Sequence, residues 1–184
     1  MELGMAIRSR RKAGEQSLQS LADQAGISRA MLSDIERGAK NPTIKVVCQI
    51  AEALHCSVSD LLNEPGSAAP EVSVLRAGAG RHLVDPQTGI QRSLLAPSFV
   101  ARGLEVVWYE VPPGQDTGIF PAHPPGTAEH LTLVAGRLEC YVGPELMILE
   151  AGDSLTFRAD VPHRFINRDA SPAAYFLVIA APRA

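Results

Sequence analysis

The spacing of hydrophobic and polar residues divides the chain into two parts. Up to about residue 62, apolar residues recur at the three- and four-residue spacing of a helix. Beyond about residue 72 the period falls to two, in short runs rich in β-branched and aromatic residues. Between them, the segment NEPGSAAPE breaks both patterns with Pro, Gly, Ser and Ala. We therefore expect one domain at 1–62, a linker at 63–71 and a second domain at 72–184.

The N-terminal pattern predicts short helices separated by caps and tight turns. Leu18, Leu21 and Ala25 follow the i, i+3, i+7 spacing of one helix face. Ser17 can cap this helix at its start, and Gly26 can end it in a left-handed turn. Including a helix ahead of this one, we expect five short helices in a compact all-α bundle. The later ones run from Ser28 to Gly38, from Pro42 to Leu54, and through a short turn ending near Leu62.

The C-terminal pattern predicts an all-β domain. Gly and Pro punctuate its apolar runs roughly every eight to twelve residues, which is typical of an antiparallel sandwich or a small barrel. The predicted fold class is therefore α + β with two domains. The clearest strands are LEVVWYEV (104–111), HLTLV (130–134), RLECYV (137–142) and AYFLVIA (174–180).

Composition and charge limit the cellular compartment and the kind of partner that we expect for the protein. The 184 residues are 46% hydrophobic, yet no run of 18 apolar residues is present and the start of the chain does not read as a signal peptide. Three cysteines without Cys-x-x-Cys spacing suit a reducing cytoplasm. The net charge is −3, but the N-terminal part of the chain is slightly basic and the C-terminal part is acidic. That asymmetry suits a nucleic-acid-binding module joined to a domain that avoids a polyanion.

Residues 17–38, SLQSLADQAGISRAMLSDIERG, form two predicted helices joined by a Gly-Ile-Ser turn. This segment resembles the helix-turn-helix of the Xre class of phage-repressor-like regulators, and the resemblance covers residues 3–62. The resemblance implies a buried structural ion pair between Arg11 and Glu36.

The second helix of such a motif enters the major groove of DNA by its N-terminal end. There Arg29 can contact guanine and Ala30 can touch a thymine methyl group. Asp34 would face DNA, where its carboxylate must accept from cytosine or be held by a cation such as Arg37. The predicted DNA-binding residues are Ser17, Gln19, Ser28, Arg29, Ala30, Ser33, Asp34, Arg37, Lys40 and Asn41.

Two further motifs lie in the β-rich part. Residues 121–138, PAHPPGTAEHLTLVAGRL, and a second segment after Gly152 resemble the paired motifs of the cupins, which are small jelly-roll β-barrels. In the first motif Pro125 occupies the slot of a second histidine, and in the second Arg158 and Asp160 depart from the pattern. The positions that match are His123, Glu129, Gly136, Gly152, His163 and Asn167.

The resemblance implies that His123, Glu129 and His163 converge inside the barrel. On a strand, His123 and Pro125 would share the inward face with Glu129 nearby. Two imidazoles and one carboxylate suit one divalent metal, with Fe(II), Zn, Ni and Mn all compatible. The alternative is that these three residues line a pocket without metal. In either case we place Tyr109 at the wall of the effector pocket and Arg158 near its rim, where it could hold an anionic effector.

Together the two resemblances imply a bacterial transcription factor of the Xre–cupin kind rather than an enzyme. Such a protein would bind a palindromic operator as a homodimer and sense a small molecule through the barrel. The rival prediction is a mononuclear iron enzyme of the phosphonate-epoxidase type, which shares this two-part plan. A third alternative is a barrel that only dimerises.

Overall fold

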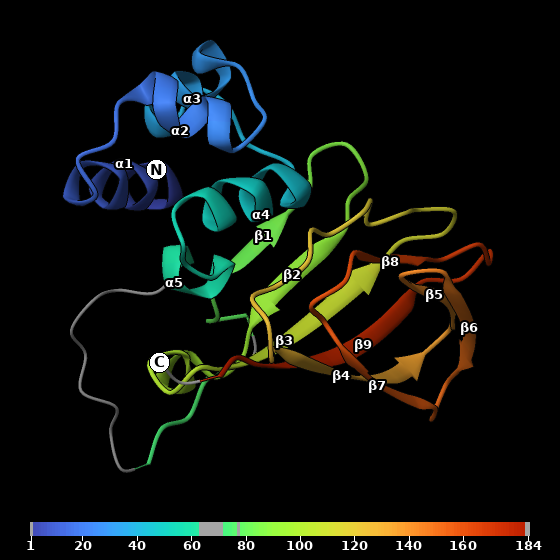
Figure 1. The fold of residues 1–184 in the computed structure, drawn as a ribbon. Coiled ribbons are helices and arrows are strands. Elements are labelled where there is room, and N and C mark those ends of the chain that lie inside the picture. Colours follow the sequence, from blue (N-terminus) through green and yellow to red (C-terminus); the bar gives the residue numbers. More distant parts are fainter. Residues whose placement is uncertain (1, 63–71, 77, 183–184) are drawn as a thin grey trace. The chain divides into compact units, whose positions relative to one another are not determined.

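The computed structural model describes residues 2–62, 72–76 and 78–182 (Figure 1). The chain divides into two compact units, Met1–Pro65 and Gly66–Ala184. The linker expected at 63–71 lies outside the described residues and remains a prediction. Within the described part of the chain, no helix is both long and apolar enough to cross a membrane.

The N-terminal unit is helical. Four helices start at a hydroxyl side chain that accepts a hydrogen bond from the backbone N–H three residues later, which satisfies one donor of the first turn. The capping residues are Ser17, Ser28, Thr43 and Ser57, with distances of 3.0, 3.1, 3.3 and 3.0 Å. The helices in the described part of this unit are α1 (Glu2–Ala13), α2 (Leu18–Gln24), α3 (Arg29–Glu36), α4 (Ile44–Ala53) and α5 (Val58–Leu62).

The apolar faces of these helices meet in one core. Leu21 of α2, Leu32 of α3 and Ile50 of α4 are completely buried. Gly26 and Gly38 follow α2 and α3 with φ of +64° and +70°. Residues that have a Cβ rarely adopt this left-handed conformation. The turn between α2 and α3 therefore has the form that the sequence predicted.

The C-terminal unit consists of two antiparallel sheets. The larger has the strand order β1-β2-β3-β9-β4-β7, and the smaller has the order β6-β5-β8. One short helix, α6 (Pro97–Val100), was not predicted. The strands are β1 (His82–Val84), β2 (Gln91–Leu94), β3 (Leu104–Val111), β4 (Ala128–Ala135), β5 (Arg137–Val142), β6 (Glu145–Glu150), β7 (Ser154–Arg158), β8 (His163–Ile166) and β9 (Ala173–Ala180).

Alternation along the strands separates the core from the outer face of the larger sheet. Val107 of β3 and Leu131 of β4 are completely buried, and Leu177 of β9 is nearly so. On the opposite face, Trp108 and Phe176 pack edge to face with ring centroids 4.7 Å apart. The architecture is thus α + β in two units, as predicted, and the strands expected at 104–111 and 137–142 have those bounds.

Candidate functional site

A buried ion pair joins the first helix to the end of the third. Arg11 Nε donates to Glu36 Oε1 at 2.7 Å, and Arg11 Nη2 donates to Glu36 Oε2 at 2.9 Å. A further bond from Arg11 Nη1 reaches the Gln16 carbonyl at 2.8 Å. Both ionic side chains are buried, so each satisfies the charge of the other. The structure therefore brings together the two residues that the resemblance paired.

The first turn of α3 presents its side chains to solvent. Arg29 and Ala30 are exposed, immediately after the capping Ser28. One turn later Ser33 and Asp34 are partly exposed. The N-terminal end of α3 is therefore exposed in the way that entry into the major groove of DNA requires.

Asp34 has a cationic partner on its own helix end. Arg37 Nη2 donates to Asp34 Oδ1 at 2.6 Å. Asp34 was expected either to accept a hydrogen bond from cytosine or to be held by a cation such as Arg37. In the protein without DNA, the structure shows the contact with Arg37. A carboxylate held in this way offers less repulsion to a nearby phosphate.

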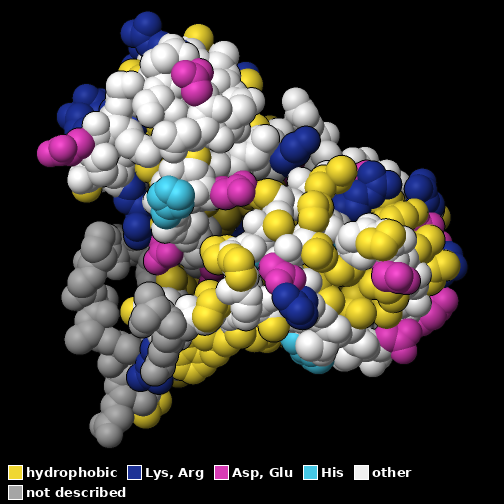
Figure 2. All heavy atoms as spheres, viewed as in Figure 1, with side chains coloured by type: hydrophobic (Ala, Val, Ile, Leu, Met, Phe, Trp, Pro, Cys, Tyr) yellow, Lys and Arg dark blue, Asp and Glu magenta, His cyan; other side chains and the backbone are white. Residues whose placement is uncertain are grey.

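The other expected DNA contacts lie at helix ends and in the loop before α4. Ser17 caps α2, Gln19 donates to Asp23 at 2.7 Å, and Lys40 and Asn41 are exposed in the loop. Figure 2 shows Lys and Arg side chains at the surface of this unit. These positions are open to solvent and carry donors of the kind that phosphate groups accept.

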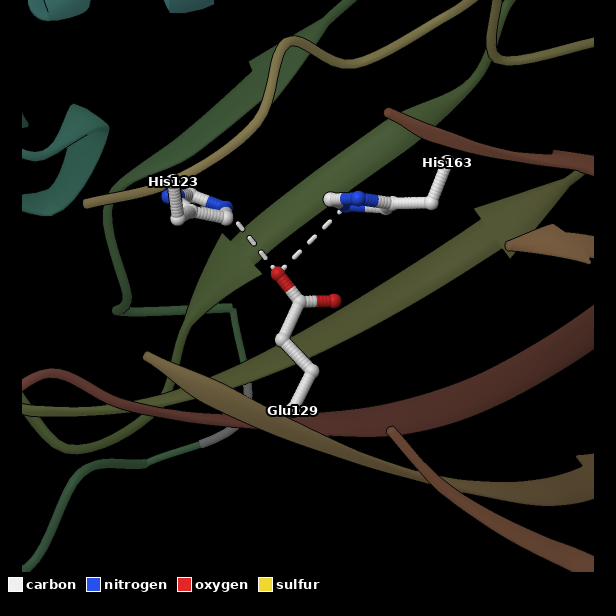
Figure 3. Close-up of side chains that lie close together, drawn as sticks. All are labelled: His123, Glu129 and His163. Atoms are coloured by element: carbon white, nitrogen blue, oxygen red, sulfur yellow. Dashed lines mark ion pairs between the residues drawn. The ribbon is translucent and has the colours of Figure 1, made fainter. Parts of the chain in front are cut away.

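In the C-terminal unit a carboxylate lies between two imidazoles (Figure 3). Glu129 Oε1 is 3.0 Å from His123 Nε2 and 3.5 Å from His163 Nε2. One ligand atom of each side chain lies within 4.8 Å of those of the other two. Glu129 comes from β4 of the larger sheet, and His163 comes from the start of β8 in the smaller sheet. The cluster thus spans the two sheets.

The surroundings of His163 fix its orientation. Its Nδ1 lies 3.0 Å from the Val161 carbonyl, which can only accept, so Nδ1 carries the proton and Nε2 faces Glu129. The rings of Phe157 and Phe120 lie with their centroids 5.3 and 5.6 Å from the imidazole. An imidazole oriented in this way can offer its Nε2 lone pair to a metal ion.

Burial and hydrogen bonding oppose each other at the cluster. Burial raises the pKa of Glu129, but hydrogen bonds from His123 and His163 outweigh it and lower the pKa to about 2. Burial lowers the pKa of His163, but the hydrogen bond and charge of Glu129 outweigh that effect and raise the pKa overall. The cluster therefore favours an ionised carboxylate beside positive charge, whether that charge is a proton or a metal ion.

The expected strand around His123 is wrong. Residues 121–127 lie in no strand, because the paired prolines and Gly126, with φ of +87°, turn the chain there. A hydrogen bond of 2.8 Å from the backbone N–H of His123 to the Ala159 carbonyl holds the loop against the unit. His123 still reaches Glu129, but Pro125 is exposed and does not share an inward face with it. Pro125 is therefore outside the site.

Arg158 also lies outside the site, contrary to expectation. Its side chain is 81% exposed and pairs with Asp160. Strand alternation explains the position, since the ring of the preceding Phe157 faces His163 and Arg158 takes the opposite face. Tyr109 is buried on the inner face of β3, where it stacks on Tyr175 with ring centroids 5.1 Å apart.

The motifs did not point to several buried polar residues on the inner face of the larger sheet. Arg92 of β2 donates from Nη2 to Glu105 Oε2 of β3 at 2.7 Å, with both side chains largely buried. Tyr175 of β9 is completely buried. The alternation of side chains along β9 would have placed Tyr175 on the inner face. The residues that lie beside it on adjacent strands depend on the strand register.

Two family models match parts of the chain. Residues 7–61 match a helix-turn-helix model, and residues 107–179 match a cupin domain model. Among curated relatives, the HTH-type transcriptional regulator SutR of Escherichia coli (strain K12) is 28% identical over 170 residues. That match covers 91% of this chain and 88% of SutR.

Solved structures with both units are also similar. An HTH_3 family transcriptional regulator from Vibrio cholerae superposes with a TM-score of 0.78 at 25% identity, covering 99% of this chain and 96% of that one. Hydroxypropylphosphonic acid epoxidase from S. wedmorenis superposes with a TM-score of 0.50 at 18% identity, covering 98% and 97% of the two chains. The second likeness is one of fold alone.

Proposed function

We infer that the chain, which unites an Xre-like helix-turn-helix domain with a cupin domain, is a DNA-binding transcriptional regulator. The observation that carries this inference is the pairing itself, because regulators match the chain over nearly its whole length and theirs. We further propose that the cupin domain binds a small effector and that the protein acts on DNA in the cytoplasm as a homodimer. An effector changes DNA affinity only by binding the DNA-competent and incompetent states unequally.

On this proposal the first turn of α3 reads base edges. Arg29 is exposed there and can donate two hydrogen bonds to guanine, while Ala30 can contact a thymine methyl group. The exposed residues around α2 and in the loop before α4 would contact phosphates and fix the register of the helix in the groove. Arg11 and Glu36 would hold α3 at the angle that this contact requires.

Arg29→Ala tests this proposal. We expect the variant to lose its preference for the cognate palindrome by about 1–3 kcal/mol, while its affinity for random DNA changes little. Footprinting and mobility-shift titrations on the DNA upstream of the gene would measure both. Lys45→Ala is the matched control, because Lys45 is an exposed cation of α4 in the same unit. Unchanged sequence preference in Arg29→Ala would contradict the assignment of α3.

We also propose that His123, Glu129 and His163 hold one divalent metal ion. The donor set fits, because two imidazole nitrogens and a carboxylate oxygen already lie within 4.8 Å of one another, with Glu129 and His163 buried and His123 partly exposed. Three protein ligands leave positions for an effector atom or water. Fe(II), Zn, Ni and Mn all accept these ligands, and the metal would supply a Lewis-acidic centre for binding an oxygen or nitrogen donor.

An iron-dependent enzyme is a second candidate function. The specific observation in its favour is the His–Glu–His cluster, together with a fold similar to that of hydroxypropylphosphonic acid epoxidase. The match to regulators is closer, with a TM-score of 0.78 against 0.50. Turnover of a 2-hydroxyalkyl phosphonate by iron-loaded protein would favour the enzyme, whereas tight operator binding without turnover would favour the regulator.

A further inference from the structure

Within the described residues of the C-terminal unit, the buried polar side-chain atoms without a hydrogen-bond partner include one on β9 and one on the adjacent strand β4. One is the hydroxyl of Tyr175, and the other is Oε2 of Glu129. Tyr175 is 0% exposed and Glu129 is 1% exposed. Burying such atoms without partners is costly, so proteins generally satisfy them. The two atoms therefore require an explanation beyond the contacts of Glu129 Oε1 with the histidines.

The two side chains lie on the same inner face of adjacent strands. In the register of β4 with β9, Glu129 lies opposite Ile179, and Tyr175 lies opposite Leu133. Glu129 and Leu133 are four residues apart on one strand, so both point inward. Figure 3 shows Oε2 of Glu129 directed away from the contact with His123. Burial raises the pKa of the Tyr175 phenol, and the charges of Tyr109, Cys140 and Glu129 add to this effect.

The chemistry of the two atoms is complementary. A carboxylate oxygen only accepts, whereas a tyrosine hydroxyl at neutral pH can donate. A hydroxyl group is the smallest group that satisfies both, since it donates to one oxygen while accepting from the other. An anionic group of the effector would instead face Glu129 Oε2 with like charge.

We propose that Tyr175 and Glu129 together bind a hydroxyl group of the effector, which makes the effector a small hydroxylated molecule. This inference rests on the proposed effector-binding role of the cupin domain. The hydroxyl donates to Glu129 Oε2 and accepts from the Tyr175 O–H. A molecule without the hydroxyl leaves both buried atoms unsatisfied, so discrimination against it is strong.

The test compares molecules that differ only in a hydroxyl group. The probes are two neutral pairs, lactamide against propionamide and glycolamide against acetamide, titrated calorimetrically into the full-length protein with and without bound Zn²⁺. We expect the hydroxylated member of at least one pair to bind about tenfold more tightly. Equal affinities within both pairs, or no binding by any of the four, would overturn the proposal.

Tyr175→Phe then assigns the contact. This variant removes one oxygen from a completely buried ring, so we expect it to fold, which its thermal unfolding would verify. We expect it to lose about tenfold in affinity for the hydroxylated probe and to bind the deoxy probe unchanged. The matched control is Tyr141→Phe, which removes the hydroxyl that donates to Glu139 at 3.1 Å in the smaller sheet. Equal losses in both variants, or none in Tyr175→Phe, would overturn the role of Tyr175.

Operator binding measured on the same preparations separates this inference from the proposed function. Protein that binds its palindrome but shows no preference for hydroxylated probes retains the regulatory function and overturns the inference alone. Protein that binds no specific DNA yet discriminates between the paired probes through Tyr175 overturns the regulatory function and leaves the hydroxyl site standing.

Discussion

Glu129 is the residue on which the chemistry of the C-terminal unit depends. Its carboxylate is the one group that contacts both His123 and His163 in the cluster. Removing the carboxylate would leave two imidazoles without the negative charge that balances a cation, and removing His163 would leave two ligands where a metal needs at least three.

Metal content measured on protein purified without chelator tests the cluster. We expect a near-stoichiometric divalent ion in the parent protein and its loss in Glu129→Ala and in His163→Ala. His130→Ala is the matched control, because His130 is next to Glu129 but exposed on the outer face, with Nδ1 2.7 Å from the Thr156 hydroxyl. A parent protein free of metal after loading with each candidate ion would contradict the proposed metal site.

The lowered pKa of Glu129 predicts an acid-dependent stability. Because the pKa falls from 4.5 to about 2 on folding, ionised Glu129 stabilises the fold fully above pH 4.5, and this contribution is lost as the pH falls towards 2. The shift corresponds to at most about 3 kcal/mol. In metal-free protein, urea unfolding across this range should show a steeper loss of stability for the parent than for Glu129→Gln. Parallel pH profiles would contradict the prediction.

The sequence predicted the position of a site residue where a motif sets its spacing, and failed where the position depends on strand geometry. Some site residues belong to motifs whose spacing can be recognised in a single sequence, namely Arg11 with Glu36 and the three residues of the cluster. The structure brings each of these sets together. Pro125 was misplaced because the expected inward face assumed a regular strand through a proline-rich loop. Arg158, expected near the pocket rim, is exposed at the end of β7 and pairs with Asp160. The place of Tyr175 near Glu129 was not predicted, because it depends on the register of two strands far apart in sequence.

At the scale of elements, the turn between β4 and β5 is tightly constrained. Gly136 has φ of +78°, and a Cβ added there would lie 2.6 Å from the Pro172 carbonyl oxygen. The clash is with backbone, which cannot move aside as a side chain could. Glycine at this position therefore lets the turn between β4 and β5 approach the start of β9 closely.

Gly136→Ala should therefore destabilise the C-terminal unit by more than the strain of a left-handed residue alone, which is about 1–2 kcal/mol. The matched control is Gly143→Ala in the turn between β5 and β6. That position has φ of +54°, but a Cβ added there would meet no other atom within 4 Å, so only the backbone strain applies. Urea denaturation of both variants gives the comparison, and equal losses of stability would contradict the proposed clash.

Helices and strands were predicted more completely than their ends. Caps and turn glycines marked α2 and α3 because hydroxyl and glycine chemistry acts within a few residues. The run at 130–134 extends in the structure to Ala128–Ala135, because pairing with β9 and β7 continues the strand through residues whose own propensity is weak. The short helix α6 has no apolar periodicity long enough to be recognised.

For the whole molecule, the proposed regulator requires two copies on one operator. Two recognition helices of a symmetric dimer contact half-sites about 34 Å apart along DNA. The C-terminal unit presents hydrophobic side chains on the face shown in Figure 2, and its exposed ones include Ile119, Leu146 and Phe176. We propose that the two copies associate through this unit.

Light scattering coupled to gel filtration should give twice the 19.6 kDa of one chain. Cutting the palindrome to one half-site should then weaken binding by at least about a hundredfold, since one of two helices loses its contacts. A monomer that binds one half-site as tightly as the palindrome would contradict the dimer.

The distribution of aromatic residues gives the molecule separate optical signals. Trp108 is the only tryptophan, and residues 1–65 contain no Phe, Trp or Tyr. Near-ultraviolet absorbance and intrinsic fluorescence therefore originate entirely in the β-rich unit, where Trp108 packs on Phe176 and donates to Glu110 at 2.9 Å. Far-ultraviolet circular dichroism follows mainly the helices of the other unit. The melting of each half can thus be recorded in one unlabelled sample.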